Sequence, residues 1–238
     1  MSSPRATSPA PPAHPAEPGR AARTSLILAV PSAVLLLLVA VSWSPLISFD
    51  REVADWLHRS AVDSPGAVRV NRILTDWLWD PWTMRALIAA ACVVLWWRGE
   101  RLLAVWVAAV SATSSALQQL VKWSVGRERP QWTDPVDSAH FAAFPSGHAL
   151  QATVTCALLL WLLRLHGVTG RWWRWSVAAA VISVAGVGVT RLYLGVHWPT
   201  DVLAGWLMGS CWVMASIAVY HRVLRARRRR RSDGAAPA

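Results

Sequence analysis

The chain has 238 residues, of which 54% are hydrophobic and only 16% are charged, and its formal net charge is +11. This composition excludes a typical soluble domain and a disordered chain, because both carry more polar residues. All of its 24 basic residues are arginine except Lys122. The arginines stand beside apolar segments, which favours membrane topology and anionic lipid as the reason for the charge, and we expect no nucleic-acid partner.

The predicted elements begin after a polar tail. Residues 1–24 are rich in proline, alanine and serine and have no apolar period, so we expect a disordered tail. Six apolar segments follow, and each reaches the length of a membrane span either alone or with its flanks. The expected spans are 25–43, 82–97, 102–121, 147–165, 175–191 and 202–221.

A further helix is expected between the first two spans, where Val53, Trp56 and Leu57 share one helical face. Such a face predicts a short helix that lies on the outer membrane surface. The predicted fold class is therefore all-α: an integral membrane bundle of six transmembrane helices with a short outer-surface helix.

The arginines predict the orientation of this bundle. They cluster in the N-terminal tail, after the second and fourth spans, and after the sixth span, where Arg227 to Arg231 form a run. Six spans place all four clusters on one side, which should be the cytoplasm. We expect a multi-pass protein of the cell membrane with both termini cytoplasmic. Its parts would be a tail (1–24), a membrane domain (25–222) and a basic tail that touches anionic lipid (223–238).

Three short polar stretches interrupt this apolar chain. They run from Lys122 to Pro130, from Pro145 to His148 and from Arg191 to Asp201. Each falls where a predicted span meets the non-cytoplasmic side. The orientation of the spans is predicted from arginines in other loops. The placement of all three polar stretches on the same side is therefore a largely separate argument that they form one site.

Cations and backbone donors in these stretches suit a tetrahedral oxyanion. Lys122, Arg129 and Arg191 are cations at helix ends in a membrane, where charge is costly and usually functional. Arginine offers forked donors to phosphate oxygens and lysine a compact charge. Ser146 and Gly147 precede a helix whose N-terminus attracts anions. The sequence therefore predicts that these five residues form a pocket for a tetrahedral oxyanion.

Two histidines and an aspartate supply the reactive groups. His197 and Asp201 are four residues apart, so the carboxylate can hold one imidazole nitrogen while the other attacks phosphorus. His148 is the expected general acid. No acidic cluster suggests Mg²⁺ and no His/Cys set suggests Zn²⁺, so we expect no metal and no cofactor. The three cysteines, Cys92, Cys156 and Cys211, are expected to be small hydrophobic residues.

Several neighbouring residues receive no catalytic role. Arg127 is expected to be a solvated loop charge, and His140 matches no part of the pattern. Gln118 and Gln119 precede Lys122 by about one helical turn. They either line the pocket or bond between helices, and the sequence leaves this choice open.

The three stretches resemble the signature of the type 2 phosphatidic acid phosphatases, or lipid phosphate phosphatases, which share their site with the vanadium haloperoxidases. The family pattern is Lys-x6-Arg-Pro, Pro-Ser-Gly-His and Ser-Arg-x5-His-x3-Asp, and this chain departs from it only at Thr190, which keeps the hydroxyl. The resemblance covers roughly residues 80 to 220. It implies a helical bundle, usually with six spans. The implied phosphate-binding residues are Lys122, Arg129, Ser146, Gly147 and Arg191, with His197 as nucleophile, Asp201 as its orienting partner and His148 as general acid.

The sequence thus predicts a metal-independent membrane phosphatase that acts through a phosphohistidine. Its substrate would be a lipid phosphate or a polyprenyl or other lipid pyrophosphate, such as the carrier lipid of wall synthesis, with phosphatidic acid and phosphatidylglycerol phosphate as close competitors. Two alternatives remain open: a lipid phosphotransferase that uses the same site, and a membrane protein that binds lipid without catalysis. Oligomeric state cannot be inferred.

Overall fold

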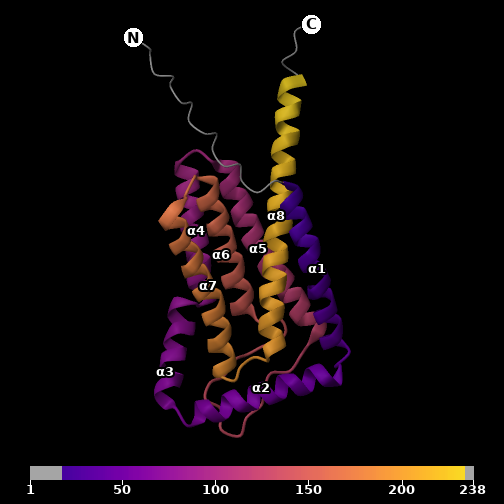
Figure 1. Ribbon diagram of the computed structural model, residues 1–238, viewed down its shortest axis with the longest axis vertical. Coiled ribbons are helices and arrows are strands. Elements are labelled where there is room, and N and C mark those ends of the chain that lie inside the picture. Colours follow the sequence, from indigo (N-terminus) through magenta and orange to yellow (C-terminus); the bar gives the residue numbers. More distant parts are fainter. Residues whose placement is uncertain (1–17, 234–238) are drawn as a thin grey trace, which may run out of the picture.

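The computed structural model describes residues 18–233, and within this range the chain forms helices and no strand (Figure 1). The predicted all-α class is confirmed. In chain order the elements are α1 (Pro18–Ala40), α2 (Ser44–Val62), α3 (Pro65–Ile73), the π-helical turn η1 (Leu74–Leu78), α4 (Pro81–Trp97), α5 (Arg101–Val125), α6 (Gly147–Leu165), α7 (Gly170–Tyr193) and α8 (Pro199–Asp233).

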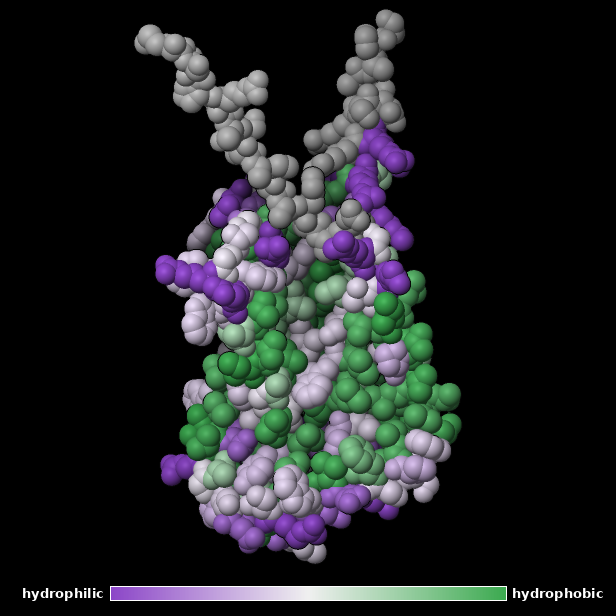
Figure 2. All heavy atoms as spheres, viewed as in Figure 1, coloured by the Kyte–Doolittle hydropathy of each residue, from purple (hydrophilic) through white to green (hydrophobic). Residues whose placement is uncertain are grey.

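Six helical segments of the described chain are long and apolar enough to cross a membrane, if α3, η1 and α4 are taken together as one segment, Pro65–Trp97. Figure 2 shows hydrophobic residues around the middle of the molecule and hydrophilic residues at both ends. Leu26 and Val30, for example, are 70% and 64% exposed. Such surface is unfavourable in water and favourable against lipid tails, so the protein is a multi-pass membrane bundle.

The helices begin and end at residues of suitable chemistry. α3, α4 and α8 all start with proline, whose fixed φ angle and missing N–H suit the first helical position. α5 ends at Gly126, which has a φ of 60° and donates its N–H to the Lys122 carbonyl at 3.0 Å. This stop places Lys122 in the last turn and starts the long loop 126–146.

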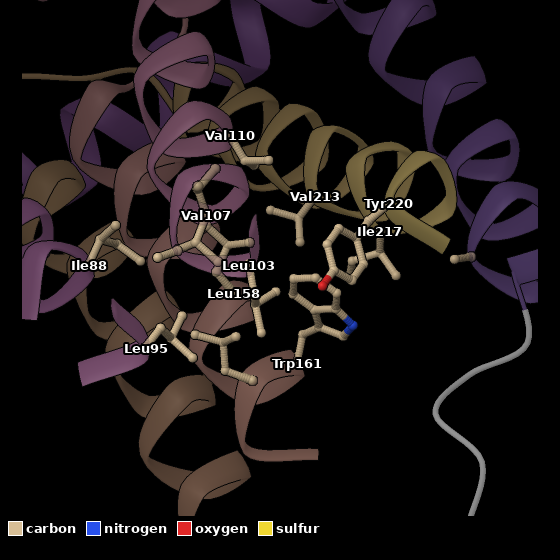
Figure 3. Packing of buried hydrophobic residues seen from close by; sticks show 14 of the residues in the cluster. Ile88, Leu95, Leu103, Val107, Val110, Leu158, Trp161, Val213, Ile217 and Tyr220 are labelled. Carbon is tan, nitrogen blue, oxygen red and sulfur yellow. The ribbon is translucent and has the colours of Figure 1, made fainter. Parts of the chain in front are cut away.

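The largest hydrophobic core lies between α4, α5, α6 and α8 (Figure 3). Val107, Leu158 and Val213 are fully buried there. Tyr220 of α8 meets the Trp161 ring of α6 edge-on, with ring centroids 5.2 Å apart. This packing holds the long helices side by side and so fixes the relative positions of their ends.

The connections between helices are divided between the two ends of the bundle (Figure 1). The first residue of α1 and the last of α8 lie at one end, with the α4–α5 and α6–α7 turns. Helix α2, the loop 126–146 and the turn 194–198 lie at the other. The predicted separation of arginine-rich and motif-bearing loops therefore holds in the fold.

The terminal helices extend beyond their predicted bounds. α1 begins at Pro18, so the expectation of a disordered tail is wrong for residues 18–24, whereas residues 1–17 lie outside the described part. The extension is explained by packing, because Ala21 is buried in a cluster that includes Leu224 of α8. α8 continues through the basic segment to Asp233.

The surface helix also differs from its prediction. α2 has 19 residues and is followed by α3, so it is longer than expected. It buries Asp50, Ala54, His58 and Ala61, and Trp56 of the predicted apolar face is 64% exposed, which leaves this face open to lipid. The buried face is thus the one that lies against the bundle.

Candidate active site

The three polar stretches meet at the end of the bundle where α2 lies. Lys122 is in the last turn of α5, and Arg191 is in the last turn of α7. Ser146 is the residue before α6, and its backbone N–H donates to the Asp201 carbonyl of α8 at 2.9 Å. The starts of α6 and α8 are therefore fastened together, and all predicted site residues lie around this junction.

His197 and Asp201 form a buried pair. Their side chains are 2% and 0% exposed, and His197 Nδ1 lies 3.3 Å from Asp201 Oδ2. The same oxygen accepts the Trp198 backbone N–H at 2.9 Å. A carboxylate only accepts, so Nδ1 carries the proton and Nε2 of the neutral ring is unprotonated and carries the lone pair. This is the tautomer that a nucleophilic Nε2 requires.

Arg129 reaches the other side of the same imidazole. Its Nη1 lies 3.1 Å from His197 Nε2 and also donates to the Val196 carbonyl. Its Nε donates to the Phe141 carbonyl at 2.9 Å and its Nη2 to the His140 carbonyl at 3.0 Å. The guanidinium thereby donates to the lone pair of Nε2, and a phosphoryl group attacked by His197 would take the place of this hydrogen bond.

Two donors of the predicted phosphate pocket have no partner among the described residues. They are Ser146 Oγ and Arg191 Nε, in residues that are 0% and 5% exposed. Arg191 makes one side-chain hydrogen bond, from Nη1 to Thr75 Oγ1 at 3.3 Å. A buried donor without a partner is costly, so these donors point to a ligand that accepts hydrogen bonds.

Lys122 and His148 complete the group. Lys122 is buried, and its Nζ donates to the Ala142 carbonyl. His148 is half-buried and lies within electrostatic range of His197, Arg191, Arg129 and Lys122. The structure thus brings both predicted imidazoles and all three predicted cations to one place.

The pKa of His197 is lowered well below its ordinary value. Burial is the main cause, and the neighbouring charges of Arg129, Arg191 and Lys122 act in the same direction. His197 is therefore neutral at pH 7, which leaves its lone pair available for attack on phosphorus.

Gly147 has a close neighbour on α5. A Cβ atom at this position would lie 2.7 Å from Gln118 Nε2, so the start of α6 and the buried Gln118 side chain are in tight contact. The sequence left open whether Gln118 and Gln119 line the pocket. In the structure Gln118 packs against Gly147, one of the predicted phosphate-binding residues. Gln119 is exposed on the outside of the bundle.

Sequence reasoning was wrong about Arg127, which is no solvated loop charge. Its side chain is only 10% exposed and pairs with Asp50 at 2.6 Å and with Asp201 at 2.7 Å. Asp50 and Thr200 belong to the same cluster, and no role was predicted for either. The one feature of the sequence that could have indicated their role is that Arg127 and Thr200 lie inside the polar stretches 122–130 and 191–201.

The described residues include no group of three His, Cys, Asp or Glu side chains that could hold a metal ion. The side chains that converge at this end are cations, hydroxyls and imidazoles, together with the paired carboxylates of Asp50 and Asp201. They can bind an oxyanion, attack it through Nε2 of His197, and transfer protons through His148.

Comparison with known proteins places these residues in a family. The PAP2 superfamily profile matches residues 103–225. The chain is 41% identical over 71 residues to an undecaprenyl-diphosphatase of Sulfolobus acidocaldarius (30% of each chain). It is 34% identical over 102 residues to phosphatidylglycerophosphatase B of Bacillus subtilis (42% of this chain, 49% of the relative). It thus spans about a third to a half of these two relatives.

A third relative is matched over more of its length. The chain is 30% identical over 159 residues to a decaprenylphosphoryl-5-phosphoribose phosphatase of Mycobacterium tuberculosis, covering 65% of this chain and 81% of that protein. The fold also matches the crystal structure of a transmembrane PAP2 type phosphatidylglycerolphosphate phosphatase from Bacillus subtilis. The TM-score is 0.71 at 21% identity, over 82% of this chain and 96% of the other. The profile match, the third relative and the shared fold confirm the resemblance read from the motifs: this chain belongs to the PAP2 superfamily.

Proposed function

We propose that the protein is a membrane phosphatase that hydrolyses a lipid phosphate or a lipid pyrophosphate, with His197 as the nucleophile. One observation carries the proposal. Lys122, Arg129 and Arg191 surround a neutral His197, yet among the described residues no carboxylate lies within the salt-bridge distance of 4.0 Å from any of them. Like charges that gather without a carboxylate in direct contact destabilise a protein unless an anion binds between them.

The first chemical step transfers the phosphoryl group to the enzyme. His197 Nε2 forms a bond to phosphorus while the bond from phosphorus to the lipid oxygen breaks. His148 gives its proton to that oxygen, and the negative charge of the bound phosphate favours the protonated form of His148 before transfer. Asp201 stabilises the charge that develops on the His197 ring, and the three cations stabilise the phosphoryl oxygens.

The second step releases phosphate. His148, now neutral, takes a proton from water as the water oxygen attacks the phosphohistidine. The bond between phosphorus and Nε2 breaks, and inorganic phosphate leaves. The same residues thus serve both steps, with His148 first an acid and then a base. No metal ion takes part in this scheme.

The relatives support lipid phosphates as the substrate class, because their names include phosphatases of undecaprenyl diphosphate, phosphatidylglycerophosphate and a decaprenylphosphoryl sugar phosphate. The structure adds a reason to favour substrates with a second polar group. A hollow of about 680 Å³ borders Arg129, and its wall includes Ser44, Ser48, Arg51 and Gln131 as well as one acidic residue, Glu128. Its polar wall suits a second phosphate or a hydroxylated headgroup, and we propose that polyprenyl or other lipid pyrophosphates are therefore favoured over phosphatidic acid.

The test is phosphate release by the purified protein from a panel of lipid monophosphates and diphosphates in EDTA. We expect activity to persist in EDTA. We expect His197→Ala to lower kcat by about 10⁶-fold, as loss of a nucleophile does. His166→Ala, a histidine at the opposite end of the bundle, is the control. Arg51→Gln should raise KM for diphosphates more than for monophosphates.

Each other outcome has a definite meaning. Loss of activity in EDTA or survival of activity in His197→Ala contradicts the mechanism. Transfer of phosphate to a lipid acceptor, with no free phosphate, would show a phosphotransferase. Lipid binding with no turnover of any substrate in the panel would show a non-catalytic protein.

A further inference from the structure

Arg127 lies in a buried ionic network that joins three parts of the chain distant in sequence. Its Nη2 donates to Asp50 of α2 at 2.6 Å, and its Nη1 donates at 2.7 Å to Asp201 of α8 and to the Thr200 hydroxyl. The two carboxylate side chains are fully buried, and the guanidinium also lies over the Trp198 ring at 5.5 Å. One cation therefore bridges two buried carboxylates and offsets half of their combined negative charge.

This network distinguishes Arg127 from the three predicted phosphate-binding cations. Arg129 and Arg191 bond to neutral groups, so their charges remain available to an anion. The charge of Arg127 is already matched by Asp50 and Asp201. Arg127 is therefore unsuited to hold the substrate phosphate, although it lies two residues from Arg129.

The network also fixes the orientation of the Asp201 carboxylate. Arg127 holds Oδ1, which prevents the carboxylate from rotating, so that Oδ2 stays directed at His197 Nδ1 and the Trp198 N–H. A carboxylate held in this way keeps its histidine in one tautomer and one ring orientation. The direction of the His197 lone pair thus depends on Arg127.

Asp50 supports this arrangement from the surface helix. Besides holding Arg127, it accepts the Thr200 backbone N–H at 3.0 Å and the Thr200 hydroxyl. The Thr200 N–H is one of the free donors at the start of α8, so Asp50 caps that helix from another element. Helix α2 is thereby joined to the turn that carries His197 and Asp201.

We propose that Asp50 and Arg127 are positioning residues for the His197–Asp201 pair, and that α2 acts as a brace for the nucleophile. This proposal rests on the phosphatase function proposed above. It predicts that loss of either residue slows the chemical step, which needs a correctly aimed imidazole. Binding of phosphate should be retained, because it depends on other residues.

The experiment compares Asp50→Asn, Arg127→Gln and Arg127→Lys with wild type. The control is Asp55→Asn, an exposed carboxylate on the same helix. We expect Asp50→Asn and Arg127→Gln to lower kcat by about 10- to 100-fold, the usual effect of losing an outer partner of a functional histidine, with KM nearly unchanged. Arg127→Lys should retain more activity than Arg127→Gln, because it keeps the charge but only part of the geometry.

Inhibition by inorganic phosphate and by vanadate distinguishes a positioning role of Asp50 and Arg127 from a role in binding phosphate. The inhibition constant of inorganic phosphate should stay near the wild-type value in Asp50→Asn and Arg127→Gln. Inhibition by vanadate should weaken, because a five-coordinate transition-state mimic requires a correctly placed His197 Nε2. The double variant Asp50→Asn/Arg127→Gln should lose less activity than the product of the two single losses, since Asp50 acts in part through Arg127.

The proposal is overturned by unchanged kcat in Arg127→Gln, by parallel loss of phosphate and vanadate inhibition, or by additive effects in the double variant. If Arg127→Gln does not fold, Asp50→Asn and Arg127→Lys decide by the same measures, because both keep side chains of similar size. His197→Ala is assayed alongside. Its failure to abolish activity rejects the proposed function, whereas normal kcat in Asp50→Asn with an inactive His197→Ala rejects only the positioning role.

Discussion

At the scale of single residues, the proposed chemistry depends on His197 being neutral with Nε2 unprotonated. Burial and three cations lower its pKa, while Asp201 holds the proton on Nδ1. A bound phosphate dianion opposes the cations and raises the pKa again, so the ring becomes easier to protonate once substrate is in place. In the proposed mechanism, the resting state therefore favours attack, and the liganded state tolerates the charge that develops on the ring.

A pH profile tests this electrostatic argument. A nearby cation disfavours imidazolium, so Arg129→Gln should raise the pKa of His197 in the free enzyme, and a larger fraction of the ring is then protonated at a given acidic pH. The acid limb of the plot of kcat/KM against pH should move to higher pH. The quantity to measure is the pH at which the acid limb falls. Loss of a phosphate contact, in contrast, lowers kcat/KM at every pH. Arg174→Gln, at the opposite end of the bundle, should leave the limb in place, and an unmoved limb in Arg129→Gln contradicts the argument.

At the scale of helices, the site depends on how closely α6 and α8 approach. Gly205 and Gly209 of α8 are four residues apart and face α6. A Cβ on Gly205 would lie 2.8 Å from the Ser146 carbonyl, and one on Gly209 would lie 3.1 Å from the Leu150 carbonyl. Small residues at this spacing let helix backbones approach closely in a membrane. The approach brings the start of α6 to Asp201, where the Ser146 N–H bonds to the Asp201 carbonyl.

Gly205→Ala should therefore damage both stability and activity. The added methyl group meets backbone atoms, which cannot move aside as a flexible side chain can. We expect a loss of about 1–3 kcal/mol in stability, typical of overpacking, together with a lower kcat, because Ser146 shifts relative to Asp201. Thermal unfolding in detergent and phosphate release measure the two effects. Gly66→Ala, where a Cβ meets nothing within 4 Å, is the control, and equal effects of both variants would reject the close-approach argument.

At the scale of the whole molecule, the two ends of the bundle differ in chemistry. One end carries the α4–α5 and α6–α7 turns and the basic extension of α8 (Figure 1). The other carries α2 and the candidate active site. Arginine-rich segments are retained on the cytoplasmic side during insertion. We therefore propose that the active site opens on the non-cytoplasmic face.

Cysteine labelling in intact cells measures this orientation. In a chain whose Cys92, Cys156 and Cys211 are replaced by alanine, Ser138→Cys should react with a membrane-impermeant maleimide. Thr169→Cys should react only after the cells are permeabilised. Both positions are exposed, and they lie in connections at opposite ends of the bundle. The reverse pattern would place the site in the cytoplasm.

The sequence by itself determined the helical class, the number of spans and the identity of the motif residues. Apolar runs of membrane length have few alternatives to helix, since backbone groups in lipid must bond within their own segment. The motif residues are recognisable because their spacing is local, as with His197 and Asp201 four residues apart. The arginine counts predicted which connections share an end, and the fold has them so grouped.

Only the tertiary structure decided which charges are buried and what surrounds them. The sequence predicts a solvated charge at Arg127 because its partner Asp50 lies 77 residues away. Local spacing carries no information about such a contact. The same reason explains the early start of α1, which rests on α8, and the face that α2 buries. Whether an ionisable group is solvated or paired depends on which distant elements pack against it, and that is a property of the folded bundle.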